Sequence, residues 1–321
     1  MPETLDFEEP IAPLLKQLEE LVALPRTDSA QREIDALQRK IDTLRAEVYA
    51  SLTPWQRVQV ARHPNRPGLE AFIGLLFEDF VEIHGDRRFA DDHAIMTGFA
   101  NYKRQPVLLV GHVKGADTKE KIFRNFGYAR PEGYRKALRA MRLAEKFRRP
   151  IVVFIDTPAA YPGIESEERG VAEAIAINLR EMMVLDTPIV VIVSGEGGSG
   201  GALGIAVGDA VLMQEYAIYS VIPPEGCAAI LWRDANKKVE AAEALKLTAP
   251  DLVKAGIVDR VIMEPVGGAH TDPATAAALV ADALDEVLAE VTSTDPSARL
   301  EKRYAKFRSM GRAGIDFVDE G

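Results

Sequence analysis

Cysteine is almost absent from this sequence, which has one such residue, Cys227, among 321. A single cysteine excludes an internal disulfide and a cysteine-ligated zinc site, and it fits a reducing compartment. Long apolar runs are also missing: none approaches the roughly 20 residues that a membrane-spanning helix needs. The N-terminal segment MPETLDFEEP is acidic and has no apolar core, unlike a signal peptide. We therefore expect a cytoplasmic protein that does not span a membrane.

Acidic residues outnumber basic ones over the whole chain, but basic residues are concentrated in one block. The formal net charge is −10, which argues against nucleic acid as the main partner. Residues 101–150 nevertheless contain 14 Lys or Arg and 4 Asp or Glu, a local charge of +10. Such a block suits an anionic ligand, such as the phosphates of a coenzyme. For any single one of these side chains, a solvated helix face is the better explanation.

The first 55 residues predict a helical hairpin. Apolar residues step by three and four along two segments, and Pro25 ends the first. Asp28 with Gln31 is expected to cap the second helix. Each apolar seam is too short for an autonomous coiled coil, so it predicts packing on the main domain or on a partner. We expect two domains, 1–55 and 56–321. The apolar positions are Ile11, Leu14, Leu18 and Leu21, then Ile34, Leu37, Ile41, Leu44 and Val48.

From about residue 100, short apolar runs alternate with amphipathic helical stretches. The runs are rich in β-branched residues and lack polar alternation, as strands buried on both faces do. Helices are expected at 133–148, at 167–183 and from the N-cap Asp272 onward. This alternation predicts an α/β domain with a largely parallel sheet. The predicted strands lie at 106–111, 151–155, 189–193, 210–213 and 258–263.

A glycine-rich segment follows the predicted strand at 189–193. Five of the seven residues from 195 to 201 are glycine. Glycine costs conformational entropy, so a cluster predicts close approach of the backbone to something, or positive φ. Bare N–H groups at the start of a short helix would then point at negative charge.

Three motifs fit this glycine-rich segment, and each is weak alone. Residues 195–200 match the dinucleotide fingerprint G-x-G-x-x-G, although the next helix is short and Glu215 would have to be the acid. Residues 197–201 match the nucleophile elbow G-x-S-x-G around Ser199, although His270 is the only later histidine. The third interpretation is an oxyanion hole of backbone amides. A tight strand–helix junction is the structural alternative, but five glycines exceed what packing alone requires.

A second loop, at residues 155–163, also follows a predicted strand and precedes a helix. Pro158 and Pro162 stiffen this loop. Tyr161 is placed either to flank a planar ligand or to fill the core. Asp156, at the strand end, is either a catalytic group or a cap of the local turn.

Several longer motifs occur in a fixed order along the chain. They are KEKIFRNFG at 119–127, PEGYRKALR at 131–139, the loop at 155–163, EERG at 167–170, GEGGSGGA at 195–202, SVIPPEGCAAILW at 220–232 and GGAH at 267–270. Together they resemble the alpha-subunit family of bacterial acetyl-CoA carboxylase carboxyltransferases. The resemblance runs from LDFEEPI near the N-terminus through Arg303-Tyr304, and it is far more specific than any glycine pattern.

The resemblance implies a fold and a reaction. The fold is an α/β, crotonase-like (ClpP/crotonase) superhelix of stacked ββα units with an N-terminal helical hairpin. In the reaction, carboxybiotin carried on a partner protein gives its carboxyl group to acetyl-CoA, and malonyl-CoA forms for fatty acid biosynthesis. Related enzymes use no metal and no side-chain base for this step. Backbone N–H groups hold the biotin ureido oxygen, and the biotin nitrogen removes the acetyl proton.

The family pattern also implies which residues form the site. The oxyanion hole is expected at Gly200 and Gly201, and no metal site is expected in this chain. The other implied residues are Gly197, Gly198, Ala202, Ala160 and Tyr161 on the biotin side, and Lys121 and Arg124 toward coenzyme A phosphates or the biotin carrier.

The resemblance further implies that this chain works only with other proteins. The expected partners are a zinc-bearing carboxyltransferase beta subunit, which would supply a second oxyanion hole, a biotin carboxyl carrier protein and an ATP-dependent biotin carboxylase. An α2β2 heterotetramer is expected.

Two positions depart from the family pattern. Ala159 replaces a glycine of T-P-G-A-Y-P-G, which argues against close ligand approach at that position. The turn before Glu225 reads P-P-E-G where the family usually reads S-P-E-G, so Pro224 follows a second proline. At this point a nicotinamide-dependent dehydrogenase, a serine hydrolase and a non-catalytic scaffold remain as alternatives.

Overall fold

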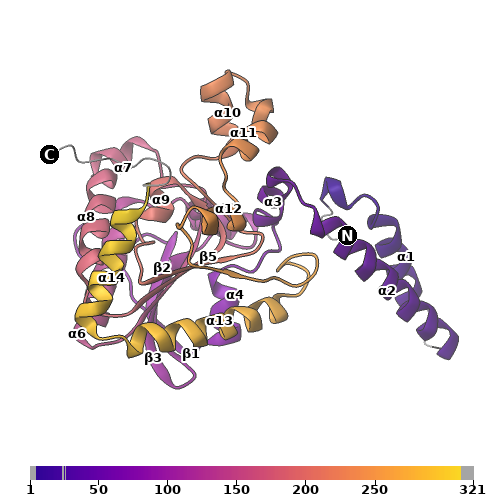
Figure 1. Cartoon of the computed structure of the whole chain (residues 1–321), viewed down its shortest axis with the longest axis horizontal. Helices are drawn as coiled ribbons and strands as arrows, with labels where there is room; N and C mark the ends of the chain where they lie inside the picture. Colours follow the sequence, from indigo (N-terminus) through magenta and orange to yellow (C-terminus); the bar gives the residue numbers. More distant parts are fainter. Residues whose placement is uncertain (1–4, 24, 26, 312–321) are drawn as a thin grey trace.

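The computed structural model describes residues 5–23, 25 and 27–311 (Figure 1). Within them one eight-stranded sheet has the strand order β1-β2-β3-β4-β5-β6-β8, and β7 pairs with β5. Residues 1–4 and 312–321, at the outer ends of the two predicted domains, lie outside this description. The strands are β1 (Glu78–Glu82), β2 (Ile95–Tyr102), β3 (Gln105–His112), β4 (Ile151–Thr157), β5 (Ile189–Gly198), β6 (Ala210–Gln214), β7 (Ile218–Ser220) and β8 (Arg260–Ile262).

The sheet is antiparallel at one edge and parallel elsewhere. Strands β1, β2 and β3 pair antiparallel. From β3 through β4, β5 and β6 to β8 every pairing is parallel, and β7 joins β5 in parallel. The five predicted strands and the largely parallel sheet are confirmed, whereas β1, β2 and β7 were not predicted.

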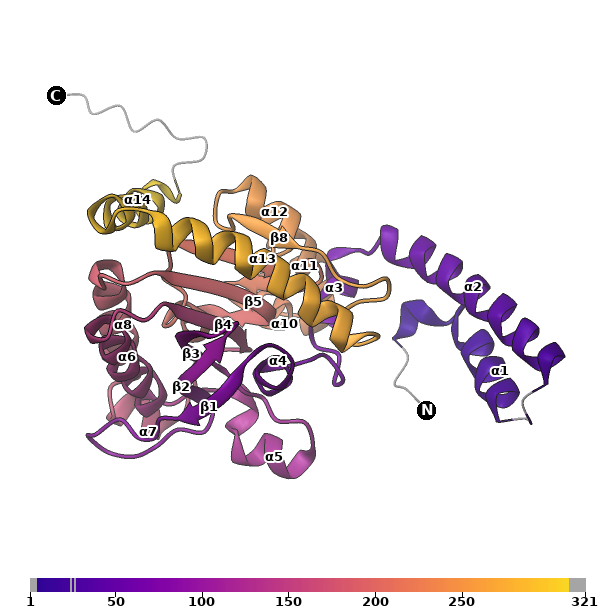
Figure 2. The same ribbon diagram turned by 90° about the horizontal axis from the view of Figure 1, so that it is seen from below.

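Helices cover both faces of the sheet (Figure 2). Helices α6 and α8 pack on one face, and α4 and α13 pack on the other. The described helices are α1 (Ala12–Val22), α2 (Asp28–Ala50), α3 (Pro54–Ala61), α4 (Leu69–Leu76), α5 (Thr118–Phe123), α6 (Pro131–Lys146), α7 (Ile164–Glu168), α8 (Val171–Val184), α9 (Ser199–Leu203), α10 (Pro224–Trp232), α11 (Lys238–Ala244), α12 (Ala249–Lys254), α13 (Pro273–Ser293) and α14 (Pro296–Ser309).

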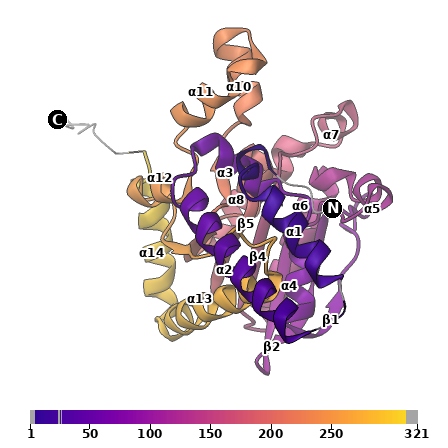
Figure 3. The same ribbon diagram turned by 90° about the vertical axis from the view of Figure 1, so that its right-hand side faces the viewer.

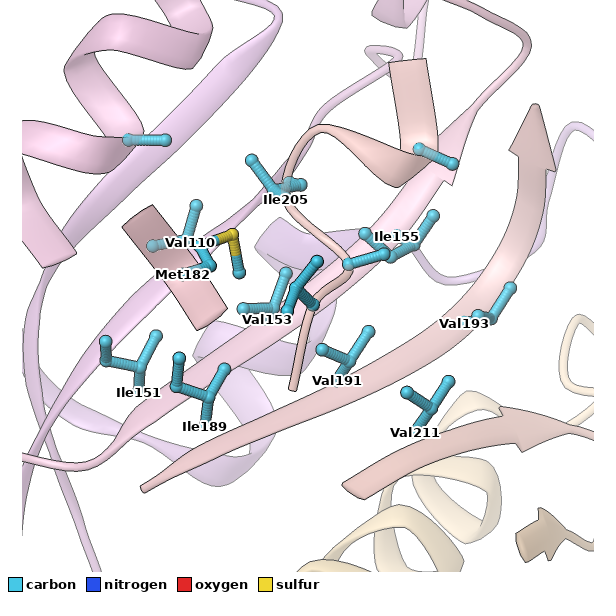
Figure 4. Packing of buried hydrophobic residues seen from close by; sticks show 14 of the residues in the cluster. Val110, Ile151, Val153, Ile155, Met182, Ile189, Val191, Val193, Ile205 and Val211 are labelled. Atoms are coloured by element: carbon cyan, nitrogen blue, oxygen red, sulfur yellow. The ribbon is translucent and has the colours of Figure 1, made fainter. Parts of the chain in front are cut away.

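Alternation along the central strands divides the core into two layers. Val153 and Val191 belong to the layer under α6 and α8, where Met182 of α8 joins them (Figure 4). Their neighbours Phe154 and Ile192 belong to the opposite layer. Because successive side chains of a strand point to opposite faces, a strand covered on both sides must be apolar throughout. This is why the sequence showed unbroken apolar runs at these positions.

Two local details of the helices differ from the sequence predictions. The helix expected at 167–183 is two helices, because Gly170 takes a left-handed conformation with φ of +78° between α7 and α8. The expected cap of α2 by Asp28 and Gln31 is wrong: the Ala30 N–H donates to Thr27 Oγ1 at 3.1 Å. The predicted start of α13 is confirmed, since the Thr275 N–H donates to Asp272 Oδ1 at 3.0 Å.

Helices α1 and α2 lie side by side and extend away from the sheet (Figures 1 and 3). Ile11, Leu37 and Ile41 are buried between them, at positions of the two predicted seams. Helix α3 instead packs near β7, where Val58 contacts the apolar cluster around Ile218. The domain boundary at residue 55 stays a prediction. None of the described helices is long and apolar enough to cross a membrane.

Candidate functional site

The carboxyl ends of three neighbouring parallel strands meet at one edge of the sheet. Strand β3 leads into Lys114, β4 ends with Asp156 and Thr157, and β5 ends at Gly198. Ligands of open α/β sheets bind at such an edge. The two loops noticed in the sequence therefore lie next to each other.

Four of the five glycines in the segment 195–201, all except Gly200, are required by packing, and three of these four belong to β5. A Cβ on Gly195 would overlap Asp156 Oδ1, and one on Gly198 would overlap the Pro158 carbonyl oxygen. A Cβ on Gly197 would lie 2.8 Å from the Tyr219 ring. All three residues belong to β5 and are buried. The inference that five glycines exceed what packing requires was therefore wrong for these three and for Gly201. Ligand contact by Gly197 and Gly198 stays a prediction.

Gly200 and Gly201 differ in what surrounds them. A Cβ on Gly201 would overlap the peptide that joins Ala159 to Ala160, so this glycine allows the two loops to touch. A Cβ on Gly200 would meet only Ile175 Cδ1, at an ordinary 3.6 Å. Gly200 is half-buried, whereas Gly201 is buried. Of the two, only Gly200 has a bare face that the protein leaves open.

The backbone turns sharply between β5 and α9 and presents free amides. Ser199 has φ of +54°, a conformation that costs a non-glycine residue about 1–3 kcal/mol. The first N–H groups of a helix have no partner inside it. No hydrogen bond among the described residues uses the N–H of Gly200 or Gly201. Ala202 is the next residue of α9 and is fully buried, so its side chain packs in the core and does not line the open face.

The turn at Ser199 has the shape of a nucleophile elbow, but the histidines do not complete a triad. His270 stacks on His63, with ring centroids 3.8 Å apart. Burial lowers the pKa of the His112 and His270 rings to about 3. Within the described part of the chain no hydrogen bond joins either ring to Ser199, so neither histidine is in place as the base of a hydrolase.

The loop after β4 lies against the start of α9. The Tyr161 N–H donates to the Ala129 carbonyl oxygen at 2.9 Å, which fixes the loop to the segment before α6. The Arg130 guanidinium carbon lies 4.9 Å from the centroid of the Tyr161 ring. Ala160 and Tyr161 are both half-buried. The structure thus brings the loop with Ala160 and Tyr161 against Gly201, and the binding roles of these residues stay predictions.

A charge network beneath the glycine segment was missed from the sequence. Lys114 Nζ lies 2.6 Å from Asp156 Oδ1 and 3.4 Å from Glu196 Oε2. Arg62 Nη2 lies 2.6 Å from Glu196 Oε1, and its Nη1 lies 2.7 Å from Glu225 Oε1. Burial disfavours the charge of Lys114, but Asp156 and Glu196 outweigh this and raise the pKa of Lys114 above its ordinary value. One indication of this network is present in the sequence, which is that Lys114 follows closely after the predicted strand at 106–111.

A cavity of about 470 Å³ opens beside this network. It lies between the segment after α3 and the segment after β3, and Lys114, Lys121 and Asp156 are among its lining residues. Arg124 does not line the cavity: its Nη2 forms an ion pair of 2.7 Å with Glu70 Oε1. Lys121 and Arg124, which were predicted to share one role, therefore have different surroundings. Of these two, only Lys121 lines the cavity.

Comparison with known proteins identifies the family of this chain. Residues 4–311 match the family described as acetyl co-enzyme A carboxylase carboxyltransferase-like. The chain belongs to this family. A relative from Geobacter metallireducens, named acetyl-coenzyme A carboxylase carboxyl transferase subunit alpha, is 54% identical over 309 residues, covering 96% of this chain and 97% of the relative. A Bordetella pertussis protein of the same name is 54% identical over 311 residues, with 96% and 97% covered.

Solved structures show the same fold in more distant carboxyltransferases. Transcarboxylase 12S, solved with methylmalonyl-coenzyme A, aligns with a TM-score of 0.56 and 21% identity over 70% of this chain and 42% of that chain. A Pseudomonas malonate decarboxylase hetero-tetramer in complex with coenzyme A aligns with a TM-score of 0.55 and 17% identity, over 69% of this chain and 90% of that chain. The predicted crotonase-like α/β fold of this carboxyltransferase family member is confirmed.

Proposed function

We propose that this chain is the carboxyltransferase alpha subunit of a cytoplasmic acetyl-CoA carboxylase, which makes malonyl-CoA for fatty acid biosynthesis. The observation that carries the proposal is the turn into α9. There the free amides of Gly200 and Gly201 lie beside an open face, in a chain that matches its family over residues 4–311. Preorganised backbone donors of this kind stabilise charge that develops during a reaction.

The residues present fit a biotin group at the start of α9. Carboxybiotin, when bound, supplies the carboxyl group, and its ring nitrogen accepts the acetyl proton. The amides of Gly200 and Gly201 donate to the ureido oxygen, where negative charge grows. Gly200 admits the group because the nearest atom to an added Cβ would be Ile175 Cδ1 at 3.6 Å. Tyr161 flanks the group from the neighbouring loop. No side chain of this chain has to exchange a proton with the substrates.

Exposed apolar side chains on two helices support a partner subunit. Ile122 and Phe123 of α5 and Ile230 and Leu231 of α10 are more than half exposed. Figure 1 shows α10 and α11 projecting from the body of the protein. Large exposed apolar side chains mark protein interaction sites. We assign them to contacts with a zinc-bearing beta subunit in an α2β2 assembly, which a biotin carboxyl carrier protein visits after loading by biotin carboxylase.

The purified chain alone is expected to have no carboxyltransferase activity. It contributes one set of amide donors, whereas the reaction develops charge on both biotin and the thioester. Malonyl-CoA decarboxylation should be measured with a biotin analogue, for the chain alone and after co-purification with the beta subunit. Turnover should appear only in the complex. Robust turnover by the single chain would contradict the division of the site between two subunits.

Charge reversal at Lys121 should weaken acyl-CoA binding. Lys121 lines the cavity of about 470 Å³, so Lys121→Glu places a carboxylate where phosphates are expected. We expect the KM for the acyl-CoA to rise about 3- to 10-fold at low salt, with kcat unchanged, and the effect to shrink as salt screens the charges. Lys119→Glu, on the exposed side of the same helix, is the matched control. Equal KM values for both variants would mean that the cavity does not hold the phosphates.

A further inference from the structure

Lys114, Asp156 and Glu196 form a closed ring of polar contacts below the amide donors. Lys114 Nζ contacts both carboxylates, at 2.6 Å for Asp156 Oδ1 and 3.4 Å for Glu196 Oε2. The backbone N–H of Glu196 closes the ring by donating to Asp156 Oδ1 at 2.9 Å. The ring joins the ends of β3, β4 and β5. It fixes the backbone at residue 196, three residues before the turn at Ser199.

The ring needs the positive charge of Lys114, because the carboxylates of Asp156 and Glu196 lie close together. Asp156 Oδ1 accepts from the backbone of Glu196, so the two acidic residues cannot separate without breaking that bond. The Glu196 side chain is 6% exposed and the Asp156 side chain 16%, so water screens their repulsion poorly. Lys114 lies between them and neutralises one charge, and Arg62 neutralises the second charge from the other side of Glu196.

Arg62 connects Glu196 of the ring to Glu225, whose side chain is partly exposed at the surface. One nitrogen of its guanidinium group contacts Glu196 at 2.6 Å, and another contacts Glu225 at 2.7 Å. Arg62 is the C-cap residue of α3, and Glu225 lies in the first turn of α10. The glycine segment is therefore tied to α3 and to the projecting helix α10, whose outer residues Ile230 and Leu231 are exposed.

We propose that Lys114 is a positioning residue for carboxyl transfer: it holds Glu196 against Asp156 so that the amides of residues 200 and 201 stay aimed at the substrate. Arg62 shares this task and links the position of the amides to α10. The proposal rests on the proposed function. It assigns no chemistry to the side chains, because the ring lies below the amides and acts through the backbone. A shift of about 1 Å in a catalytic group costs on the order of 10²-fold in rate.

Lys114→Met should lower kcat of the assembled complex about 10²-fold. Because Lys114 also lines the cavity proposed to hold the acyl-CoA phosphates, KM for malonyl-CoA should rise by no more than it does in Lys121→Glu. Without the cation, the two carboxylates repel each other in a poorly screened site, and the backbone at residue 196 moves. Lys114→Arg should retain most of the activity. The double variant Lys114→Met/Glu196→Gln removes one charge of each sign and should recover part of the loss.

The matched control is Lys306→Met. Lys306 also forms an ion pair with an aspartate, Asp259, at 2.8 Å, and its side chain is 15% exposed against 24% for Lys114. Asp259 precedes β8, so this pair lies at the opposite edge of the sheet. Its kcat should equal that of the wild type. If Lys114→Met behaves like this control, or if Lys114→Arg is as slow as Lys114→Met, the positioning role is wrong.

Hydrogen exchange separates this proposal from the proposed function. Amides of a peptide covering residues 195–205 should exchange faster in the Lys114→Met chain than in wild type, and no faster in the Lys306→Met chain. This readout needs no catalysis. An inactive wild-type complex would contradict the proposed function while the exchange result still tests the ring. Unchanged exchange in Lys114→Met would overturn the ring even in an active complex.

Discussion

Gly200→Ala is expected to lower the turnover of the assembled carboxyltransferase by about 10²–10³-fold. The added Cβ enters space that the protein leaves open, 3.6 Å from Ile175 Cδ1, so the fold should tolerate it. The methyl group instead occupies the open face beside the amide donors and holds the biotin group away from them. Malonyl-CoA decarboxylation in a complex of normal size and melting temperature measures the effect.

Two neighbouring variants make this result interpretable. Ser199→Ala should keep nearly full activity, because no nucleophile is needed and the left-handed backbone there is no harder for alanine than for serine. Gly201→Ala is a poorer test than Gly200→Ala, since its Cβ would overlap the 159–160 peptide and shift both loops. Loss of all activity in Ser199→Ala together with a silent Gly200→Ala would show that a side chain, not the amides, carries the reaction.

Arg303→Met is expected to lower the free energy of unfolding by about 3–5 kcal/mol. Arg303 is 1% exposed, and its guanidinium group donates to both carboxylate oxygens of Asp209 at 2.8 Å. It also donates to the carbonyl oxygens of Met182, Leu185 and Thr187 at 2.7–2.9 Å. Methionine fills much of the volume but leaves a buried carboxylate and three carbonyl groups without this donor. Urea unfolding of the purified chain measures the change.

Lys302→Met controls for the loss of a cation from the same helix. Lys302 is exposed, so its removal should change the free energy of unfolding by less than about 0.5 kcal/mol. If both variants unfold at the same urea concentration, Arg303 does not hold α14 to the core in the way its contacts indicate.

The sequence predicted the main parallel strands, and it missed β1, β2 and the short strand β7. The strands β3 to β6 and β8 were found because burial on both faces requires an unbroken apolar run. Strand β1, with the sequence EDFVE, is mostly exposed, and β7 has three residues. Neither has enough apolar residues to differ from a loop. The break between α7 and α8 at Gly170 could not be predicted either, because the sequence does not show whether a glycine within a helical pattern has a positive φ.

The site was located from the sequence, but the roles of its residues were not resolved. Glycine letters alone cannot distinguish Gly195, which makes room for Asp156, from Gly200, which faces open space. That distinction depends on a residue 39 positions earlier in the chain. The Lys114–Glu196 contact joins residues 82 positions apart, and no local pattern predicts it. Local charge counts likewise grouped Lys121 with Arg124, although Glu70 already pairs with the latter.

Following the carboxyl carbon tests carboxyl transfer most directly. The complex of this chain with a beta subunit should be incubated with biocytin and with malonyl-CoA labelled in its free carboxyl group. The account predicts that label appears on biocytin as acetyl-CoA forms, and that neither product forms when this chain is omitted. Transfer of label at the same rate without this chain, or release of label without any dependence on biocytin, would contradict it.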